Sequence, residues 1–319
     1  MNTQATNNKN DSKTKFSSGH RTCAGCPAPL IVRTVLKAIE DPVIVSAATG
    51  CLEVTTTIYP QTSWNVPFIH SAFENVSATI SGIEAAYKNL KQRPQLMQNK
   101  NFKLSKSMKF VAFGGDGGTY DIGLQSLSGA LERGHDFLYI CYNNEGYMNT
   151  GGQRSGATTQ GASTSTTPSG SKSFGKIQVK KNLLEIVEAH GIAYLAQAST
   201  FNLMDLEKKV KKAMTFKGPK FINVLSPCPT VWKFPPNLLR QINLLAVDTL
   251  FWPIYEIENG VYNINYRPKE KVPVEEFLKL QKRFRHLFKD EDKTVINQIQ
   301  NHIDEQWQKL QTRAENTNK

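Results

Sequence analysis

Four of the five cysteines follow a pattern that could bind a metal. Cys23 and Cys26 are separated by two residues in CAGCP, a spacing that allows a redox disulfide, half of a zinc site or one side of an iron–sulfur cluster. Cys51 in ATGC and Cys228 in SPCPT each follow a predicted strand. Because ligands bind at the carboxyl ends of strands in an open parallel sheet, the four thiols could converge there.

The spacing alone leaves the kind of site open. Zinc ribbons usually combine two CxxC pairs at short separation, whereas this chain has one such pair and two single cysteines. Four thiolates also hold a 4Fe–4S cluster, and Cys228 followed by Pro229 is like the last ligand of ferredoxin runs. The pattern favours a cluster over zinc, with a mixture of buried thiols as a further alternative. Cys141 lies inside a predicted strand and is interpreted as a small buried hydrophobe.

A glycine-rich turn, GGDGG, ends the predicted strand 108–114 and leads into a predicted helix. The free N–H groups and the positive dipole end of such a helix suit a diphosphate. Gly115, Gly117 and Gly118 would let the backbone approach that diphosphate closely. Asp116 would supply one oxygen to a divalent cation.

A second loop, YNNEGYMN, follows one helix and one strand later, so we expect it beside the first at the same edge of the sheet. The Asn144 side-chain oxygen and the Gly146 carbonyl could complete the protein share of an octahedral Mg²⁺ site that starts with Asp116. This pair of motifs resembles the thiamine-diphosphate-binding motif. A Rossmann-type nucleotide site would need GxGxxG, which is missing here. A thiamine centre that passes on single electrons needs an iron–sulfur cluster nearby, and zinc has no redox chemistry to offer.

Short apolar strands alternate with amphipathic helices along most of the chain. This alternation predicts an α/β fold, with a parallel sheet covered by helices on both faces, as in the diphosphate-binding half of thiamine enzymes. We expect strands at 42–48, 108–114, 136–142, 192–198 and 220–225, and helices at 27–40, 72–90, 120–133, 183–190 and 203–214.

The composition divides the chain into three segments. Residues 1–18 form a predicted disordered polar arm, and residues 19–229 the predicted thiamine-diphosphate and iron–sulfur domain. Residues 230–319 are predicted to be a C-terminal arm with little core of its own that packs on partner subunits. Within the domain, residues 151–175 are dominated by Gly, Ser and Thr and are interpreted as a lid or cofactor loop.

Charge and hydropathy exclude several classes of protein. The net charge is +12, from 39 basic and 27 acidic residues, but the basic residues are not clustered with aromatic ones, so we expect no nucleic-acid partner. No apolar run approaches 18 residues, which predicts no membrane span. The polar N-terminus lacks the apolar stretch of a signal peptide, and five cysteines do not make a disulfide framework, so we expect a cytoplasmic protein.

Together these motifs resemble the β subunits of pyruvate:ferredoxin oxidoreductases, within the wider 2-oxoacid:ferredoxin oxidoreductase family. The resemblance extends from about residue 19 to about residue 289 and rests on residues 19–29, 48–82, 113–135, 142–156 and 225–230. Pro27 departs from the family, which often has Gly directly after CxxC. Proline is tolerated at the start of a helix, so we expect no disturbance there.

The resemblance implies three cofactors and their ligands. A 4Fe–4S cluster would be bound by Cys23, Cys26, Cys51 and Cys228, with Cys51 also lying against thiamine diphosphate. Mg²⁺ would be bound by Asp116, Asn144 and Gly146. The other residues implied to hold thiamine diphosphate are Gly115, Gly117, Gly118, Glu145, Tyr147, Met148 and Asn149.

The resemblance also implies a reaction and partners. The reaction is oxidative decarboxylation of pyruvate with coenzyme A to acetyl-CoA and CO2, with electrons passed through the cluster to ferredoxin or flavodoxin. No residue of this chain is assigned a certain catalytic role, because the activating Glu is expected on an α subunit that carries the pyrimidine-binding domain. Further clusters are expected on a ferredoxin-like δ subunit, next to a γ subunit, so this chain should be inactive alone.

Two alternatives stay open. The same chemistry could act on another 2-oxo acid, such as 2-oxoisovalerate or 2-oxoglutarate, because substrate contacts are expected mainly on the partner subunit. A subunit that is stabilised by zinc and has no catalytic role is the alternative from another class.

Overall fold

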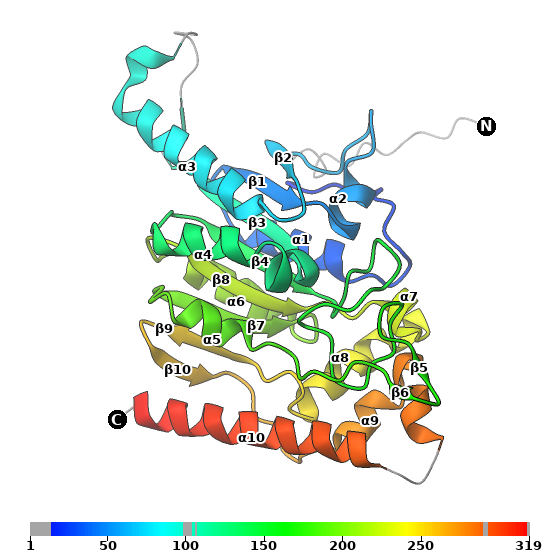
Figure 1. Cartoon of the computed structure of the whole chain (residues 1–319). Coiled ribbons are helices and arrows are strands. Elements are labelled where there is room, and N and C mark those ends of the chain that lie inside the picture. Colours follow the sequence, from blue (N-terminus) through cyan, green and yellow to red (C-terminus); the bar gives the residue numbers. More distant parts are fainter. Residues whose placement is uncertain (1–13, 98–103, 106, 290–292, 318–319) are drawn as a thin grey trace, which may run out of the picture.

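The computed structural model describes residues 14–97, 104–105, 107–289 and 293–317. Its centre is an eight-stranded sheet in the order β10-β9-β7-β8-β4-β3-β1-β2 (Figure 1). The strands from β2 to β7 in this order pair in parallel, whereas β9 and β10 are antiparallel. Their bounds are β1 (Val43–Ala48), β2 (Phe68–Ser71), β3 (Lys109–Gly115), β4 (Leu138–Asn143), β7 (Tyr194–Ser199), β8 (Lys220–Leu225), β9 (Tyr255–Glu258) and β10 (Val261–Ile264).

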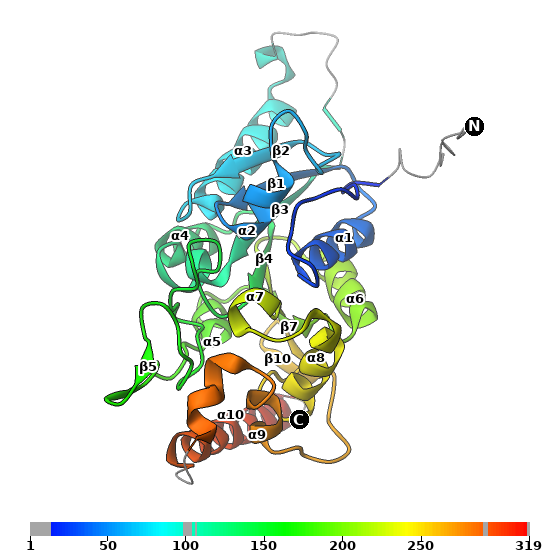
Figure 2. The ribbon, with the colours of Figure 1, turned by 90° about the vertical axis from the view of Figure 1, so that its right-hand side faces the viewer.

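Helices cover both faces of the sheet, as the sequence predicted. In Figure 2, α1 and α6 lie on one side, and α3, α4 and α5 on the other. The α-helices are α1 (Ala28–Ala38), α2 (Cys51–Thr56), α3 (Val76–Gln92), α4 (Leu124–Glu132), α5 (Leu183–Glu188), α6 (Leu203–Ala213), α7 (Pro229–Trp232), α8 (Leu239–Asp248), α9 (Val274–Leu278) and α10 (Thr294–Thr317). Shorter elements are the π-helical turn η3 (Gly117–Asp121), the 3-10 helices η2 (Pro94–Leu96), η4 (Pro236–Leu238) and η5 (Lys282–Phe288), and the hairpin strands β5 (Ser169–Gly170) and β6 (Ser173–Phe174).

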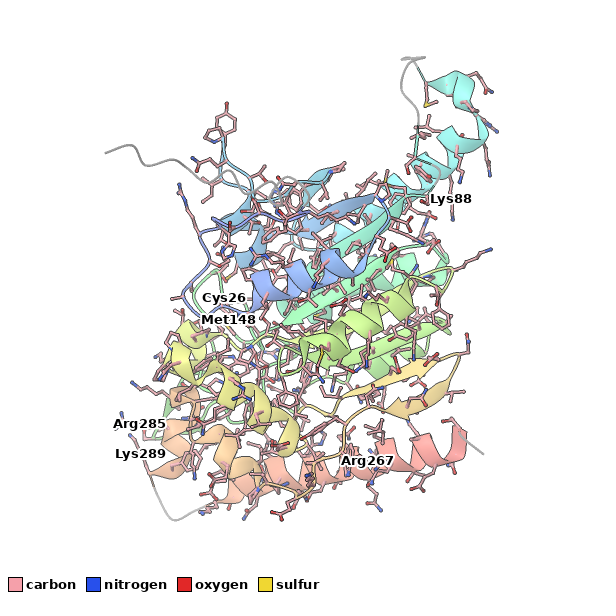
Figure 3. All side chains as sticks on the ribbon, turned by 180° about the vertical axis from the view of Figure 1, so that it is seen from behind. Cys26, Lys88, Met148, Arg267, Arg285 and Lys289 are labelled. Atoms are coloured by element: carbon pink, nitrogen blue, oxygen red, sulfur yellow. The ribbon has the colours of Figure 1, made fainter. Side chains whose placement is uncertain are left out.

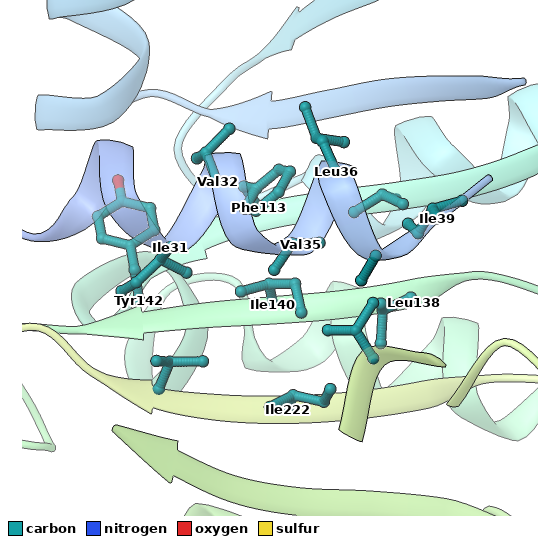
Figure 4. Packing of buried hydrophobic residues seen from close by; sticks show 14 of the residues in the cluster. Ile31, Val32, Val35, Leu36, Ile39, Phe113, Leu138, Ile140, Tyr142 and Ile222 are labelled. Atoms are coloured by element: carbon teal, nitrogen blue, oxygen red, sulfur yellow. The ribbon is translucent and has the colours of Figure 1, made fainter. Parts of the chain in front are cut away.

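Alternation along the strands builds a separate core on each face. In β3, Val111 and Phe113 pack under α1 and α6, while Phe110 and Ala112 pack under α3 and α4. Figure 4 shows the first core, where α1 places Ile31 and its apolar neighbours on the central strands. Each fully buried Val, Leu, Ile or Phe side chain contributes about 1.5–3 kcal/mol to folding. Among the described residues, no helix combines the length and the apolar character that a membrane span requires.

The C-terminal segment corrects one prediction. We expected residues 230–319 to be an arm with little core, but β9 pairs with β7, and α10 lies against the edge of the same domain (Figure 1). A third cluster, which includes Trp232, Trp252 and Phe277, is buried beneath α8, α9 and α10. The strands are only four residues long, so their apolar pattern is weak. The Asn259-Gly260 turn between them has positive φ at both positions, and this dipeptide is a strong hairpin signal in the sequence.

The polar arm predicted at the N-terminus falls mostly on residues 1–13, which lie outside the described residues. Phe16, just after them, is buried and meets the Trp64 ring edge-on at 4.9 Å. Two further elements had not been predicted. The short edge strand β2 joins the sheet beside β1, and α2 begins at Cys51 itself.

A buried polar cluster connects the C-terminal strands to the rest of the sheet. Glu256 in β9 accepts hydrogen bonds from Lys212 Nζ at 2.8 Å, Tyr194 Oη at 2.7 Å and Asn265 Nδ2 at 3.1 Å. Burial alone would raise the pKa of Glu256, but these three donors outweigh it and the net shift is below the ordinary value of 4.5. Lys212 also pairs with the more exposed Glu258 at 2.6 Å. The cluster therefore stabilises the folded state when Glu256 is ionised.

We predict that Glu256→Gln lowers the free energy of unfolding at pH 7 by about 1–3 kcal/mol, because three donors lose a charged acceptor. The pKa of Glu256 is lower in the folded state, so this stabilisation is complete above the unfolded pKa and is lost as the pH falls through the lower native value. Denaturant unfolding at pH 7 and near pH 4 measures this change. The difference in free energy of unfolding between Glu256→Gln and wild type should be smaller near pH 4 than at pH 7. Glu258→Gln is the control and should cost less than about 1 kcal/mol. Equal effects of the two variants would contradict the prediction.

Candidate functional site

The turn after β3 needs glycine for steric reasons. A Cβ atom at Gly117 would lie 2.6 Å from the Tyr147 ring, and one at Gly118 would lie 2.8 Å from the Phe73 carbonyl oxygen. The turn continues as the π-helical η3 before α4 begins, although the sequence predicted one α-helix from 120 to 133. Such π-helical turns occur often at functional sites.

Asp116 is fully buried at this turn. Its Oδ1 accepts the backbone N–H of Asn144 at 3.0 Å, and its Oδ2 accepts the hydroxyl of Ser155. Burial raises the pKa of Asp116 to about 7, even though both hydrogen bonds act in the opposite direction. Neither contact supplies a positive charge, so a cation at this position would stabilise the ionised carboxylate.

Three polar groups meet at Asp116 in the arrangement that the sequence suggested. The end of the Asn144 side-chain amide that faces Asp116 lies 2.9 Å from both Asp116 Oδ1 and the Gly146 carbonyl oxygen. With nitrogen at this position, the amide donates to both oxygens. With oxygen there, three oxygens face one another, and this donor set fits Mg²⁺. The two loops that supply these groups are far apart in sequence and meet because β3 and β4 are parallel neighbours.

Glu145 differs from its predicted place in a cofactor contact, since its carboxylate points into the protein. It pairs with Arg283 at 2.8 Å and with Lys180 at 3.0 Å, and it accepts the Thr159 hydroxyl. Burial would raise the pKa of Glu145, but Lys180 and Arg283 outweigh it, so the net shift is downward. Arg283 and Lys180 had not been singled out in the sequence, because an ion pair between segments 138 residues apart leaves no local pattern.

The rest of the second loop lies over the glycine turn. The Tyr147 hydroxyl donates to the Gly117 carbonyl at 3.0 Å, and its ring stacks on Phe73 with a centroid distance of 5.5 Å. Met148 is half-buried against the C-terminal cluster, and Asn149 is exposed. Of these three predicted contacts, Tyr147 therefore touches the turn directly.

The Gly-, Ser- and Thr-rich loop packs on the same turn. Besides Ser155, which reaches Asp116, the Gly156 N–H donates to Asp121 Oδ2 at 2.8 Å. Lys181 pairs with the other oxygen of Asp121, also at 2.8 Å. The composition of the loop suggested a cofactor role, but it did not indicate that Ser155 would contact the predicted metal ligand.

The four predicted cysteines lie in one electrostatic neighbourhood. Burial raises the pKa of Cys51 to about 12, and Cys228, Cys26 and Cys23 add to this shift. Burial likewise raises the pKa of Cys26 to about 11, with smaller contributions from Cys228 and Cys23. Within the described ranges, no three His, Cys, Asp or Glu side chains are spaced to hold one metal ion. Cys141 is fully buried in β4, in keeping with its interpretation as a hydrophobe.

Tyr142 joins the cysteine region to the glycine turn. A Cβ atom at Gly50, the residue before Cys51, would lie 2.9 Å from the Tyr142 hydroxyl oxygen, and one at Gly115 would lie 3.3 Å from it. The phenol therefore fills the space between the start of α2 and the end of β3. The residue before Cys51 and the residue before Asp116 therefore approach the same phenol.

Comparison with known proteins agrees with this site. Residues 48–224 match the family described as thiamine pyrophosphate enzyme, C-terminal TPP binding domain. Pyruvate synthase subunit PorB of Thermotoga maritima is 51% identical over 307 residues, which cover 95% of this chain and 93% of that protein. PorB of Methanocaldococcus jannaschii is 52% identical over 295 residues, covering 92% and 96%.

Two further proteins with other named 2-oxo acids are similar to this chain. Ketoisovalerate oxidoreductase subunit VorB of Pyrococcus abyssi is 44% identical over 302 residues, covering 94% of this chain and 93% of that protein. The 2-oxoglutarate:ferredoxin oxidoreductase of Magnetococcus marinus, solved with 2-oxoglutarate, coenzyme A and succinyl-CoA bound, has the same fold, with a TM-score of 0.56, 23% identity and 69% coverage of each chain. The chain therefore belongs to the thiamine pyrophosphate enzymes and, within them, to the β subunits of the 2-oxoacid:ferredoxin oxidoreductase family.

Proposed function

We propose that this chain is the β subunit of a pyruvate:ferredoxin or flavodoxin oxidoreductase that binds thiamine diphosphate, Mg²⁺ and one 4Fe–4S cluster. The observation that carries the proposal is the meeting of the Asp116, Asn144 and Gly146 groups at a glycine turn, beside four interacting thiols. The PorB relatives support pyruvate as the substrate. The VorB relative makes 2-oxoisovalerate the second candidate.

The diphosphate would bind at the turn formed by residues 115–118, and the cation would be held by Asp116, Asn144 and Gly146. Ser155 and the Asn144 N–H orient the Asp116 carboxylate for this task, each by a hydrogen bond to a different oxygen. When bound, thiamine diphosphate supplies an electron sink for decarboxylation of a 2-oxo acid. The protein's part is to fix the cofactor and to exclude water, which the buried surroundings of Asp116 support.

The arrangement of the cysteines in the sequence, one CxxC pair and two single residues, supports a cluster over a zinc ribbon. In a zinc site, four thiolates bind one ion at about 2.3 Å, so they crowd together. In a 4Fe–4S cluster, each thiolate binds a different iron, so the sulfurs stand farther apart. The pKa values of Cys26 and Cys51 are raised in part by other cysteines of this set, as expected for thiols grouped around one cluster.

The raised thiol pKa values are not those of a redox-active CxxC pair. Redox-active cysteines have lowered pKa values, whereas burial raises that of Cys26 to about 11. Metal binding deprotonates a coordinating thiol outright, so a raised pKa is compatible with a ligand.

Because cluster ligands must stay reduced, we place the complex in a reducing compartment such as the cytoplasm.

Partner subunits would complete the site. We propose that an α subunit brings the activating Glu of the pyrimidine-binding domain, and that γ and ferredoxin-like δ subunits, coenzyme A and ferredoxin or flavodoxin complete the reaction. Large apolar side chains are exposed close to the cysteines, which supports a docking surface there. Val54 in α2 is 42% exposed, Ile69 in β2 40%, and Tyr59 between them 94%.

We predict that Cys51→Ser and Cys228→Ser each abolish the cluster, because a serine is a poor replacement for a thiolate on iron. Complexes purified without oxygen should lose the iron and acid-labile sulfide of one 4Fe–4S cluster per copy of this chain, together with the electron paramagnetic resonance (EPR) signal of that cluster, while the clusters on the other subunits remain. Cys141→Ala is the matched control and should retain all three, since Cys141 is buried within β4. Wild-type protein that contains zinc and no sulfide would refute the redox role.

We predict that Asp116→Asn weakens the binding of thiamine diphosphate with Mg²⁺ by at least about 100-fold, because the site loses its charged ligand. Titration calorimetry on the apo complex measures this change. Asp304→Asn is the control, since Asp304 lies on α10 and pairs with Lys271. If Asp116→Asn bound the cofactor as tightly as wild type, the assigned ligand set would be wrong.

We predict that the complete complex reduces ferredoxin with coenzyme A fastest when pyruvate is the 2-oxo acid. An anaerobic assay against pyruvate, 2-oxoisovalerate and 2-oxoglutarate tests the substrate, and omission of thiamine diphosphate and Mg²⁺ tests the cofactors. Preference for 2-oxoisovalerate would overturn the pyruvate assignment while leaving the cofactor assignment intact.

A further inference from the structure

Arg283 is a buried cation in the C-terminal segment, at the point where η5 meets the thiamine domain. It is only 4% exposed. Its guanidinium pairs with Glu145 at 2.8 Å, its Nε donates to Gln281 at 2.9 Å, and its Cζ lies 3.8 Å from the centre of the Trp232 ring. The planar fork of Arg is suited to a carboxylate and an aromatic face at once.

Through Glu145, Arg283 acts on the predicted magnesium loop. Glu145 stands between Asn144 and Gly146 and has a φ of 63°, a left-handed conformation that non-glycine residues rarely adopt. Such a conformation persists where the surroundings hold it. Here the carboxylate is held by Arg283 and Lys180, and the Glu145 carbonyl accepts the Thr158 hydroxyl at 2.7 Å. The direction of the neighbouring Asn144 and Gly146 groups therefore depends on these contacts.

Through Trp232, Arg283 also acts on the other side of the same loop. The indole Nε1–H of Trp232 donates to the Asn144 carbonyl at 2.8 Å. The Trp232 backbone N–H donates to the Cys228 carbonyl at 3.0 Å, which closes the short helix α7. Trp232 thus links the segment of Cys228, a predicted cluster ligand, to that of Asn144, a predicted magnesium ligand. The Arg283 guanidinium covers the face of the indole.

We propose that Arg283 is a positioning residue that holds the magnesium loop and the Cys228 segment in one fixed geometry. This inference rests on the proposed function, which names the ligands that are positioned. It gives the C-terminal segment a role in cofactor binding that acts through Glu145 and Asn144. A buried ion pair is weak evidence for stability, so a positional role accounts better for a charge at this depth.

The test uses the intact complex, purified without oxygen and stripped of thiamine diphosphate. The variants are Arg283→Met, Arg283→Lys and the control Arg285→Met, since Arg285 is exposed on the same segment and lies at the outer edge of the molecule (Figure 3). Mn²⁺ replaces Mg²⁺, and EPR of bound Mn²⁺ gives the dissociation constant in the presence of thiamine diphosphate. Thermal unfolding of the stripped complex and iron content are measured in parallel.

We expect Arg283→Met to raise this dissociation constant by about 10–100-fold, the range for loss of a residue that orients metal ligands. The dissociation constant of Arg283→Lys should lie between those of wild type and Arg283→Met, because lysine keeps the charge but lacks the planar fork. Arg285→Met should match wild type. Glu145→Gln combined with Arg283→Met should raise the dissociation constant by less than the product of the two single effects, because both changes break the same ion pair.

An unchanged dissociation constant for Mn²⁺ in Arg283→Met would overturn the inference, and a lower unfolding temperature beside it would show that Arg283 serves stability alone. If Arg283→Met does not assemble, Mn²⁺ binding is measured in Trp232→Phe instead. This variant keeps an aromatic ring and removes the hydrogen bond to Asn144. Binding as tight as wild type in that variant would also overturn the inference. Wild-type complex that binds no Mn²⁺ with thiamine diphosphate would instead refute the proposed function.

Discussion

The burial of one carboxylate, that of Asp116, is the constraint on which the site depends. A buried carboxylate is costly unless hydrogen bonds and a positive charge compensate it. The fold supplies the hydrogen bonds from two separate loops, through the Asn144 N–H and the Ser155 hydroxyl. Neither hydrogen bond brings a positive charge, and three polar groups meet where the proposed cation would sit. The parallel pairing of β3 with β4 makes this arrangement possible, because it brings the ends of both strands to one edge.

Beside this centre, the buried charge of Glu145 is compensated within the protein. Glu145 is surrounded by Arg283, Lys180 and Thr159, so its carboxylate is satisfied without a ligand. Two adjacent loop residues, Asn144 and Glu145, are thus used in opposite ways. One faces the cation site, and the other anchors the loop to the remainder of the protein. A left-handed backbone at Glu145 turns the two side chains apart.

The cysteines show how the same edge of the sheet serves a second purpose. Cys51 begins α2 after β1, and Cys228 precedes α7 after β8, so two strands deliver thiols to the edge where β3 delivers Asp116. Tyr142, at the end of β4, fills the space between the two groups. The proposed transfer of single electrons from thiamine diphosphate to a cluster needs such proximity.

Local sequence patterns were sufficient for the five central strands of the sheet, the helices between them and the motifs at the strand ends. Apolar periodicity located β8 at its observed bounds, and the intervals between Asp116, Asn144 and the cysteines placed them at one edge. These features depend on neighbours in sequence and on the general geometry of parallel sheets. The hairpin of β9 and β10 could have been found from Asn259 and Gly260, but its strands are too short for a clear period.

The tertiary structure alone decided which groups satisfy one another. The sequence did not indicate that Glu145 would pair with Arg283, that Ser155 would reach Asp116, or that Trp232 would bond to Asn144. Each of these contacts joins segments from 39 to 138 residues apart. They arise because a buried polar group must find a partner in whatever segment folding brings beside it, and no local period records that choice. Sequence determined what chemistry the site could contain, and packing decided how its groups are held.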